Sequence, residues 1–238
     1  MAWFAVNSWF SLLNSAVTAD SGAVSMPATT HARDVVCKCN KENQPLTIHK
    51  VIELLTNEIL TLRPATLQDK RKIFDWLTNS NLTSEMLGPP KFADNPVPTW
   101  NEFDKDYSDN YFDNSQPNNG QCFVIEHNAQ AIGQINYNPI EPETKCTEID
   151  IWLSDLQFTG KGFGTEAIRI LCCYLDKSFG CKTFFIAPSR RNEKAIKSYK
   201  KAGFIEIKKI PDNFIPDYED SVLMIKSYEK DISTQQNA

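Results

Sequence analysis

The segment from Gln157 to Thr165 contains the residues whose types and spacing point most directly to chemistry. Gly160, Gly162 and Gly164 lie in it, between a strand-like run and a helix-like run. Glycines let a backbone approach a ligand closely, and the first N–H groups of a helix lack internal partners, so such a turn can bind an anion. The spacing matches neither the P-loop of nucleoside triphosphatases nor the dinucleotide-binding fingerprint. A diphosphate or pantetheine carrier is therefore the favoured ligand.

Two acidic residues precede this turn. Glu148, Asp150 and Trp152 alternate along the strand-like run, so their side chains share one face of the strand. Two carboxylates and an indole on one face are not typical of a protein core. Either carboxylate could take a proton from an ammonium group, directly or through water. The alternative interpretation is a solvated face on which the acids only maintain solubility.

A second acidic segment lies between residues 99 and 113, with aromatic residues among its carboxylates. A substrate with several ammonium groups would favour acids beside flat aromatic rings. We take Asp106, Asp109 and Trp152 as candidate substrate-binding residues. The alternative interpretation of residues 99–113 is an ordinary solvated helix face.

Two motifs carry a resemblance to a known family. The pattern Gln157-x-x-Gly160-x-Gly162 resembles the acetyl-CoA pyrophosphate loop of the GNAT N-acetyltransferase superfamily. The segment from Asn192 to Phe204 resembles a second motif of the same superfamily, in the same order and at the same spacing. The resemblance covers about Glu58 to Tyr228 and says nothing about the first fifty residues.

The resemblance implies direct transfer of an acetyl group from acetyl-CoA to an amine, with no acyl-enzyme. Tyr199 would be the general acid that protonates the leaving thiolate, since a phenol of pKa about 10 stays protonated at neutral pH. The alternative for Tyr199 is a core-packing aromatic. Asn192 could cap a helix, bind the cofactor arm, or do both. The implied cofactor-binding set is Leu156, Gln157, Phe158, Gly160, Lys161, Gly162, Phe163, Gly164, Thr165 and Asn192.

Among superfamily members, the chain looks most like the aminoglycoside 6′-N-acetyltransferases. Asp150 falls where those enzymes have a catalytic aspartate, so we favour Asp150 over Glu148 as base or ammonium anchor. One departure is Ala187, which stands where they tend to have an aspartate. The favoured substrate is an aminoglycoside-type cationic molecule, implying antibiotic resistance. The alternatives are a protein or peptide amine, as in RimJ/RimL-like enzymes, and a non-catalytic acyl-CoA-binding sensor.

The elements that would position these residues give a mixed α/β order. The resemblance implies the GNAT fold, a twisted, mostly antiparallel sheet flanked by helices, with a splayed strand pair at the acetyl-CoA site. Alternation and apolar runs predict strands over 58–63, 122–126, 131–137, 147–153, 183–186, 204–210 and 221–227. Helical spacing predicts helices over 66–77, 99–112, 165–178 and 192–202.

Composition sets the remaining bounds. The 238 residues carry a net charge of −5, which disfavours nucleic acid and suits a cationic partner. The seven cysteines are odd in number, show no C-x-x-C pair and indicate reduced thiols of a cytoplasmic protein. The three scattered histidines predict no metal site. We expect a monomer or homodimer without stable membrane association. Residues 1–50 are interpreted as a poorly ordered extension, and the alternative for its first 20 residues is a signal or membrane-associating segment. Residues 51–230 are interpreted as the acetyltransferase domain and 231–238 as a tail.

Overall fold

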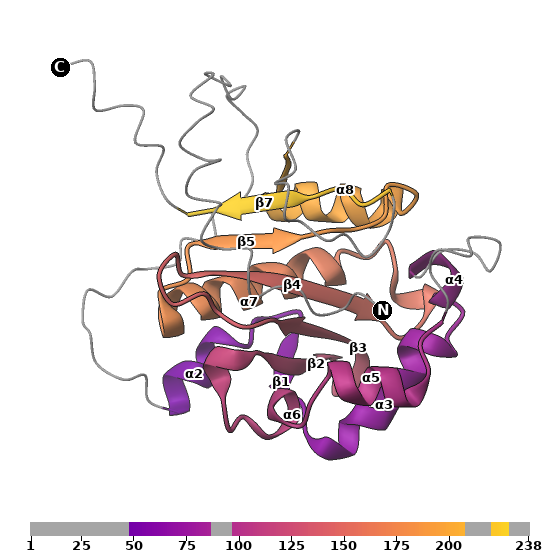
Figure 1. Cartoon of the computed structure of the whole chain (residues 1–238), viewed down its shortest axis with the longest axis horizontal. Helices are drawn as coiled ribbons and strands as arrows, with labels where there is room; N and C mark the ends of the chain where they lie inside the picture. The colour runs from indigo at the N-terminus through magenta and orange to yellow at the C-terminus, as the bar shows by residue number, and fades with distance from the viewer. Residues whose placement is uncertain (1–47, 87–96, 208–219, 229–238) are drawn as a thin grey trace.

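A twisted sheet with helices on both faces forms the centre of the protein (Figure 1). The computed structural model describes residues 48–86, 97–207 and 220–228. The seven strands formed by these residues have the order β1-β2-β3-β4-β5-β7-β6. Only β4 and β5 pair in parallel; the other neighbours are antiparallel. The predicted fold class is therefore confirmed.

Most predicted strands lie where the alternation of the sequence placed them. The strands are β1 (Thr61–Pro64), β2 (Gln121–His127), β3 (Gln130–Tyr137), β4 (Cys146–Leu153), β5 (Thr183–Ile186), β6 (Ile205–Glu206) and β7 (Met224–Ser227). The last predicted strand begins late, because Ser221 makes only an isolated bridge to Ser189. Of the predicted strand over 204–210, the structure forms Ile205–Glu206, and residues 208–210 lie outside the described part.

The helices include α2 (Ile48–Leu54), α3 (Leu67–Thr78), α4 (Thr83–Met86), α5 (Trp100–Asp106), α6 (Asn110–Asp113), α7 (Phe163–Phe179) and α8 (Glu193–Ala202). The prediction of one helix over 99–112 was wrong. The chain leaves helical geometry at Tyr107 (φ −100°, ψ 72°), whose buried ring stacks on Phe103 at a centroid distance of 4.7 Å. Aromatic packing against the sheet outweighs a continuous helix at this point.

Each face of the sheet has its own core. Ile135, Tyr137 and Ile149 point to the face covered by α7, where they join the largest apolar cluster. Cys122, Val124 and Trp152 point to the opposite face, against α3, α5 and α6. The carboxylate-bearing side of β4 therefore faces the helices α3 to α6.

The predicted extension over residues 1–47 and the predicted tail over 231–238 lie outside the described residues. The helix α2 begins at Ile48, slightly ahead of the predicted domain boundary at residue 51. In the three described ranges, no helix has the length and apolar character needed to cross a membrane.

Candidate active site at the β4–α7 junction

The two glycines of the turn before α7 adopt a backbone geometry that other residues avoid. Gly160 and Gly162 have φ of 72° and 88°, in the left-handed region. A Cβ built on either glycine would meet no atom within 4 Å, so the turn is open around them. Glycine is thus required here by the backbone path, and the open side leaves room for a ligand to approach.

The N-terminus of α7 has no side-chain cap. Gly162 occupies the cap position, and its backbone carbonyl accepts the N–H of Glu166 at 3.0 Å. Within the described residues, the N–H groups of Phe163, Gly164 and Thr165 have no acceptor. Together with the aligned peptide dipoles of a 17-residue helix, these donors have the chemistry to bind a phosphate-like anion. Lys161, which is exposed, adds a positive charge beside them.

A short 3₁₀ turn (η3, Leu156–Phe158) holds the loop in place, and its main anchor was not identified from the sequence. Asp155 caps the turn by accepting the N–H of Gln157 at 2.8 Å. Asn81 accepts the N–H of Leu156 at 2.8 Å and donates to Asp155 at 3.1 Å. The carboxamide of Asn81 therefore fixes the start of the loop from a distant part of the chain, and no local signal marks it.

The strands β4 and β5 pair only over a short stretch. Their register joins Cys146 with Thr183 and ends at Glu148 with Phe185. From Ile149 to Leu153, β4 pairs with β3, and no described strand pairs with its other edge. This is the divergence expected of the splayed strand pair (Figure 1). The backbone groups on that edge are available to an extended ligand.

Asp150 lies on β4, ahead of the η3 turn and the glycine loop, and its carboxylate is held by two amides. Asn136 and Asn138 donate to Oδ2 of Asp150 at 3.2 and 3.3 Å. Burial raises the pKa of the Asp150 carboxyl, and these two hydrogen bonds oppose the rise. A carboxyl group with a raised pKa is a stronger base than an ordinary carboxylate, so Asp150 has the chemistry to accept a proton from an ammonium group.

Asn136 and Asn138 were not among the residues singled out from the sequence. A signal was available, because amide residues occupy every second position from Gln134 to Asn138, along and just after β3, and the second half of that strand is buried. Their meaning depends on register, since Asn136 pairs across the strands with Asp150. The interaction could be recognised only after β3 and β4 were aligned.

Glu148, the second predicted carboxylate, lies on the same face of β4 as Asp150. Burial is the main cause that raises the pKa of Tyr111, and the charges of Asp150 and Glu148 add to this rise. Trp152 also shares this face, as predicted, but its side chain belongs to the core. Its indole N–H points to the carbonyl of Ile73 at 3.4 Å, and its ring meets Tyr107 edge-on. We therefore leave Trp152 out of the proposed substrate site.

The two predicted acids of the 99–113 segment differ in their surroundings. Asp109 forms an ion pair of 3.0 Å with the buried ammonium of Lys70, which Asp104 also contacts at 2.6 Å. Asp106 makes no hydrogen bond or ion pair with any described residue. Desolvation raises the pKa of Asp106, Lys105 lowers it, and Glu102 raises it. Of these two acids, Asp106 is the one whose carboxylate has no partner among the described residues and could bind an external cation.

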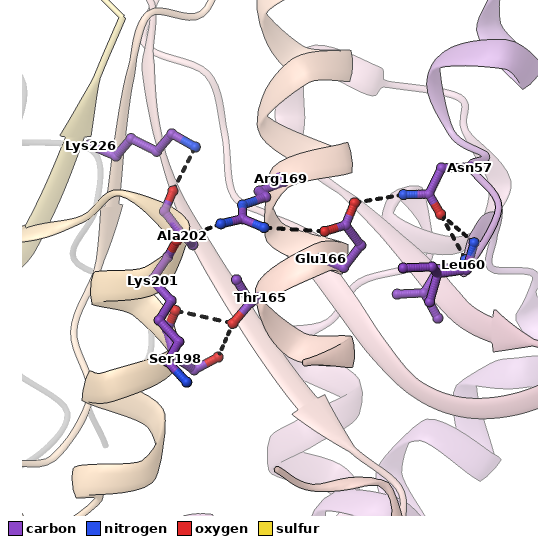
Figure 2. A network of polar contacts seen from close by, with 10 residues as sticks. Asn57, Leu60, Thr165, Glu166, Arg169, Ser198, Lys201, Ala202 and Lys226 are labelled. Carbon is purple, nitrogen blue, oxygen red and sulfur yellow. Dashed lines mark hydrogen bonds and ion pairs between the residues drawn. The ribbon is translucent and has the colours of Figure 1, made fainter. Parts of the chain in front are cut away.

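The second sequence motif forms α8, which is fastened to α7. Asn192 caps α8 by accepting the N–H of Ala195 at 3.1 Å. Thr165 and Ser198 exchange a side-chain hydrogen bond of 2.8 Å, as Figure 2 shows. Tyr199 follows Ser198, is 8% exposed and packs near Phe204, with ring centroids 6.4 Å apart. The geometry thus gives Tyr199 a core contact beside the start of α7.

The polar contacts in Figure 2 extend this fastening to both ends of the helix pair. Glu166 on α7 accepts from Asn57 at 2.6 Å and is paired with Arg169 at 3.4 Å. Lys226 on β7 donates to the carbonyl of Ala202 at 2.9 Å. The N-terminus of α7 is therefore held from the β1 side and from the α8 side.

Comparisons with known proteins identify the family of the fold. The family model described as "Acetyltransferase (GNAT) domain" matches residues 60–205. No curated protein has a matching sequence. Among solved structures, AAC(6')-Ib with ribostamycin and coenzyme A is 21% identical, with a TM-score of 0.57, covering 76% of this chain and 100% of that one.

Two further solved structures have the same fold. A spermidine N-acetyltransferase from Vibrio cholerae, in complex with CoA and spermine, is 23% identical, with a TM-score of 0.55, covering 72% of this chain and 96% of that one. The RimL ribosomal-protein alpha-N-acetyltransferase with coenzyme A is 19% identical, with a TM-score of 0.55, covering 72% and 95%. At these identities the likeness extends to the fold alone. Because the family model spans more than half of the chain, the protein belongs to the GNAT acetyltransferase family.

Proposed function

We propose that the chain transfers the acetyl group of acetyl-CoA to a primary amine of a small cationic molecule of aminoglycoside type. The observation that carries the proposal is the position of Asp150. Its half-buried carboxylate sits on β4, which is followed by the η3 turn and then by the uncapped N-terminus of α7 that would bind the pyrophosphate. A proton acceptor and a site for the pyrophosphate of the donor thus occupy one continuous segment.

The donor would be held mainly by backbone groups. The N–H groups from Gly160 to Thr165 would bind the pyrophosphate, with Lys161 adding charge. The unpaired edge of β4, together with Leu156, Gln157 and Phe158, would border the pantetheine arm. The side-chain oxygen of Asn192 already accepts the N–H of Ala195, so its side-chain NH₂ group is the one that would bind the cofactor. This arrangement supplies positioning, from which much of the rate of a bimolecular transfer can arise.

The acceptor must lose a proton before it can attack. Asp150, or Glu148 beside it, would take this proton from the ammonium group. The neutral amine nitrogen then attacks the thioester carbonyl carbon and a C–N bond forms. The nitrogen releases its second proton to solvent, and the C–S bond breaks. Tyr199 would give its phenolic proton to the departing thiolate and recover one from solvent. No covalent acyl-enzyme is needed, so no cysteine is assigned as a nucleophile.

Charge supports a cationic acceptor. The chain carries a net charge of −5, and Glu148, Asp150 and Asp106 are acids near or beside the site-bearing face. Neighbours of the same fold are described with ribostamycin and with spermine, both of which are polyamines in the chemical sense. Against the aminoglycoside assignment stands Ala187, where a further carboxylate would be expected.

A peptide or protein amine is the second candidate, because a RimL structure shares the fold to the same extent. Glu148 and Asp150 suit an α-ammonium group as well as an amino sugar. The two candidates therefore differ in how many ammonium groups the acceptor carries. They can be separated only with acceptors of both kinds.

The test is thiol release from acetyl-CoA in the presence of kanamycin, ribostamycin, spermidine, or a peptide with a free N-terminus. The proposal expects acceleration by the aminoglycosides, and loss of it in Asp150→Asn. Acceleration by the peptide alone would move the assignment to protein acetylation. Binding of acetyl-CoA in a calorimeter without turnover on any amine would favour a non-catalytic sensor, for which Tyr199→Phe should change nothing.

A further inference from the structure

A row of buried amides crosses the sheet face behind Asp150. Gln134, Asn136 and Asn138 occupy alternate positions along and just after β3, and the first two are fully buried. Asn136 and Asn138 both direct their Nδ2 groups to the same oxygen, Oδ2 of Asp150. No described residue donates to Oδ1 of that carboxylate. One oxygen is thus held twice and the other is left for an external partner.

The orientation of the two asparagine amides is fixed by donors on their oxygen atoms. Oδ1 of Asn136 accepts from Gln134 at 3.2 Å. Oδ1 of Asn138 accepts from Asn136 at 3.2 Å and from the Tyr111 hydroxyl at 3.2 Å. Because each amide oxygen is engaged in this way, each NH₂ group must point toward Asp150. A flipped amide would lose an acceptor for these donors and place its oxygen against a carboxylate.

The hydroxyl of Tyr111 donates to Oδ1 of Asn138, and its ring is held in place by close packing. Its ring is buried and meets Tyr107 edge-on at a centroid distance of 5.5 Å. A Cβ on Gly120 would lie 2.7 Å from this ring, so the ring fills the space that the glycine leaves. The hydroxyl is therefore delivered from α6 to Asn138 at a fixed position.

We propose that Asn136 and Asn138, oriented by Tyr111, are positioning residues that hold Oδ2 of Asp150 and turn Oδ1 to the acceptor ammonium. This inference rests on the proposed function, because it assumes that Asp150 receives the proton. It adds to that function a requirement for the amides of β3. Their hydrogen bonds also stabilise the ionised carboxylate, against burial, which favours its protonated form.

The charged and titratable groups around Asp150 decide whether removing an amide raises or lowers the pKa of its carboxyl group. Glu148 lies on β4 with Asp150, Tyr111 on α6 and Cys122 on β2. Desolvation raises the pKa of the Cys122 thiol, and the charge of Asp150 raises it further. From α3, Lys70 faces Cys122 and opposes that rise, and it is paired with Asp104 and Asp109. None of these charged and titratable groups donates a hydrogen bond to Asp150; its donors are the side-chain amides of Asn136 and Asn138. Removing one should raise the pKa of Asp150 further.

The experiment compares the pH dependence of kcat/KM in the wild type and in Asn138→Ala, Asn138→Asp and Tyr111→Phe. Asp150 can act as a base only when it is ionised, so kcat/KM falls on the acidic side of its pH profile. A higher pKa of Asp150 moves this acidic limb of the profile to higher pH. Loss of one hydrogen bond to a carboxylate should shift the Asn138→Ala limb upward by about one pH unit, or about tenfold in kcat/KM below the limb. Asn138→Asp should shift it further, because a second carboxylate disfavours ionisation of the first. Tyr111→Phe should shift it less.

Tyr137→Phe is the matched control. Tyr137 is a second buried tyrosine with one hydroxyl hydrogen bond, to the carbonyl of Pro117 at 2.7 Å, but its ring lies on the α7 face of the sheet. It should lose stability as Tyr111→Phe does without moving the limb. The limb due to the substrate amine should stay fixed in every variant. Thermal unfolding and acetyl-CoA affinity show that each variant is folded.

The outcomes separate this inference from the proposed function. If Asp150→Asn is inactive but Asn138→Ala and Asn138→Asp keep the wild-type limb, the positioning role is wrong and the proposed function stands. If Asp150→Asn retains full activity, the role of Asp150 itself is wrong. An upward shift in the Asn138 variants, absent in Tyr137→Phe, is the result that the proposal expects.

Discussion

The guanidinium of Arg169 on α7 donates to the backbone carbonyl of Lys201 near the end of α8, at 2.7 Å. A cation at this position satisfies one of the carbonyls that a helix leaves unpaired at its C-terminus. The same side chain is paired with Glu166 (Figure 2). The contact therefore joins the helix that would bind the donor to the helix that carries Tyr199.

Replacing Arg169 by alanine should loosen α8 against α7. Because Arg169 is about half exposed, the expected loss of unfolding free energy is only about 1 kcal/mol. Turnover should fall more than donor affinity, since Tyr199 moves while the loop stays in place. Thermal unfolding and steady-state kinetics measure the two effects. Lys197→Ala, which removes an exposed ion pair with Glu193 on α8, serves as the control and should change neither.

Gly162→Ala tests the anion-binding turn. Its φ of 88° lies in the left-handed region, so a side chain should cost about 1 kcal/mol of stability. Gly180, after α7, has φ of 73° and equally open surroundings, so Gly180→Ala carries the same strain away from the site. Calorimetry should show weaker acetyl-CoA binding for Gly162→Ala alone. Equal affinities in the two variants would contradict the assignment of the loop.

Gly133 tests the contact between β3 and β4 that supports Asp150. A Cβ at this position would lie 2.5 Å from the carbonyl oxygen of Trp152 and 2.9 Å from Cα of Leu153. Gly133→Ala should therefore force the strands apart and cost about 1–3 kcal/mol in denaturant unfolding. Gly164→Ala is the control, since its nearest neighbour would be 3.7 Å away. A stability loss for Gly164→Ala as large as that for Gly133→Ala would argue against this packing.

The two acids of the 99–113 segment should behave differently when neutralised. Asp106 has no described partner and a pKa raised chiefly by desolvation, so Asp106→Asn should raise KM for a multiply charged acceptor several-fold. Asp109 is paired with Lys70, so Asp109→Asn should lower the unfolding free energy and leave KM unchanged. Initial rates over a range of acceptor concentrations, with melting curves, decide between the two. A larger KM effect at Asp109 would restore it as the substrate contact.

The sequence was sufficient for elements with strong local signals. The strand β4, the helix α7 and the strand β5 follow from alternation, apolar spacing and glycines at the helix ends, and the structure places all three close to their predicted bounds. The predicted helix over 99–112 failed because the break at Tyr107 comes from aromatic packing on Phe103 and Trp152. Such packing depends on residues distant in sequence.

The same limit applies to the candidate site. Glu148 and Asp150 could be found by their alternation on one strand. The partners that decide their chemistry lie elsewhere: the β3 amides act through register with β4, and Lys70 reaches Asp109 from another helix. Trp152 was expected to meet substrate because it shares a face with the acids, but α3 covers that end of the strand.

The central claim is that this chain acetylates an amine with the help of Asp150. The most direct test is the mass of the acceptor after incubation with acetyl-CoA and either the wild type or Asp150→Asn, with ribostamycin and an N-terminal peptide as acceptors. We expect one added acetyl group on ribostamycin with the wild type, and a large loss of this product with Asp150→Asn despite unchanged acetyl-CoA binding. Equal product from both proteins would contradict it.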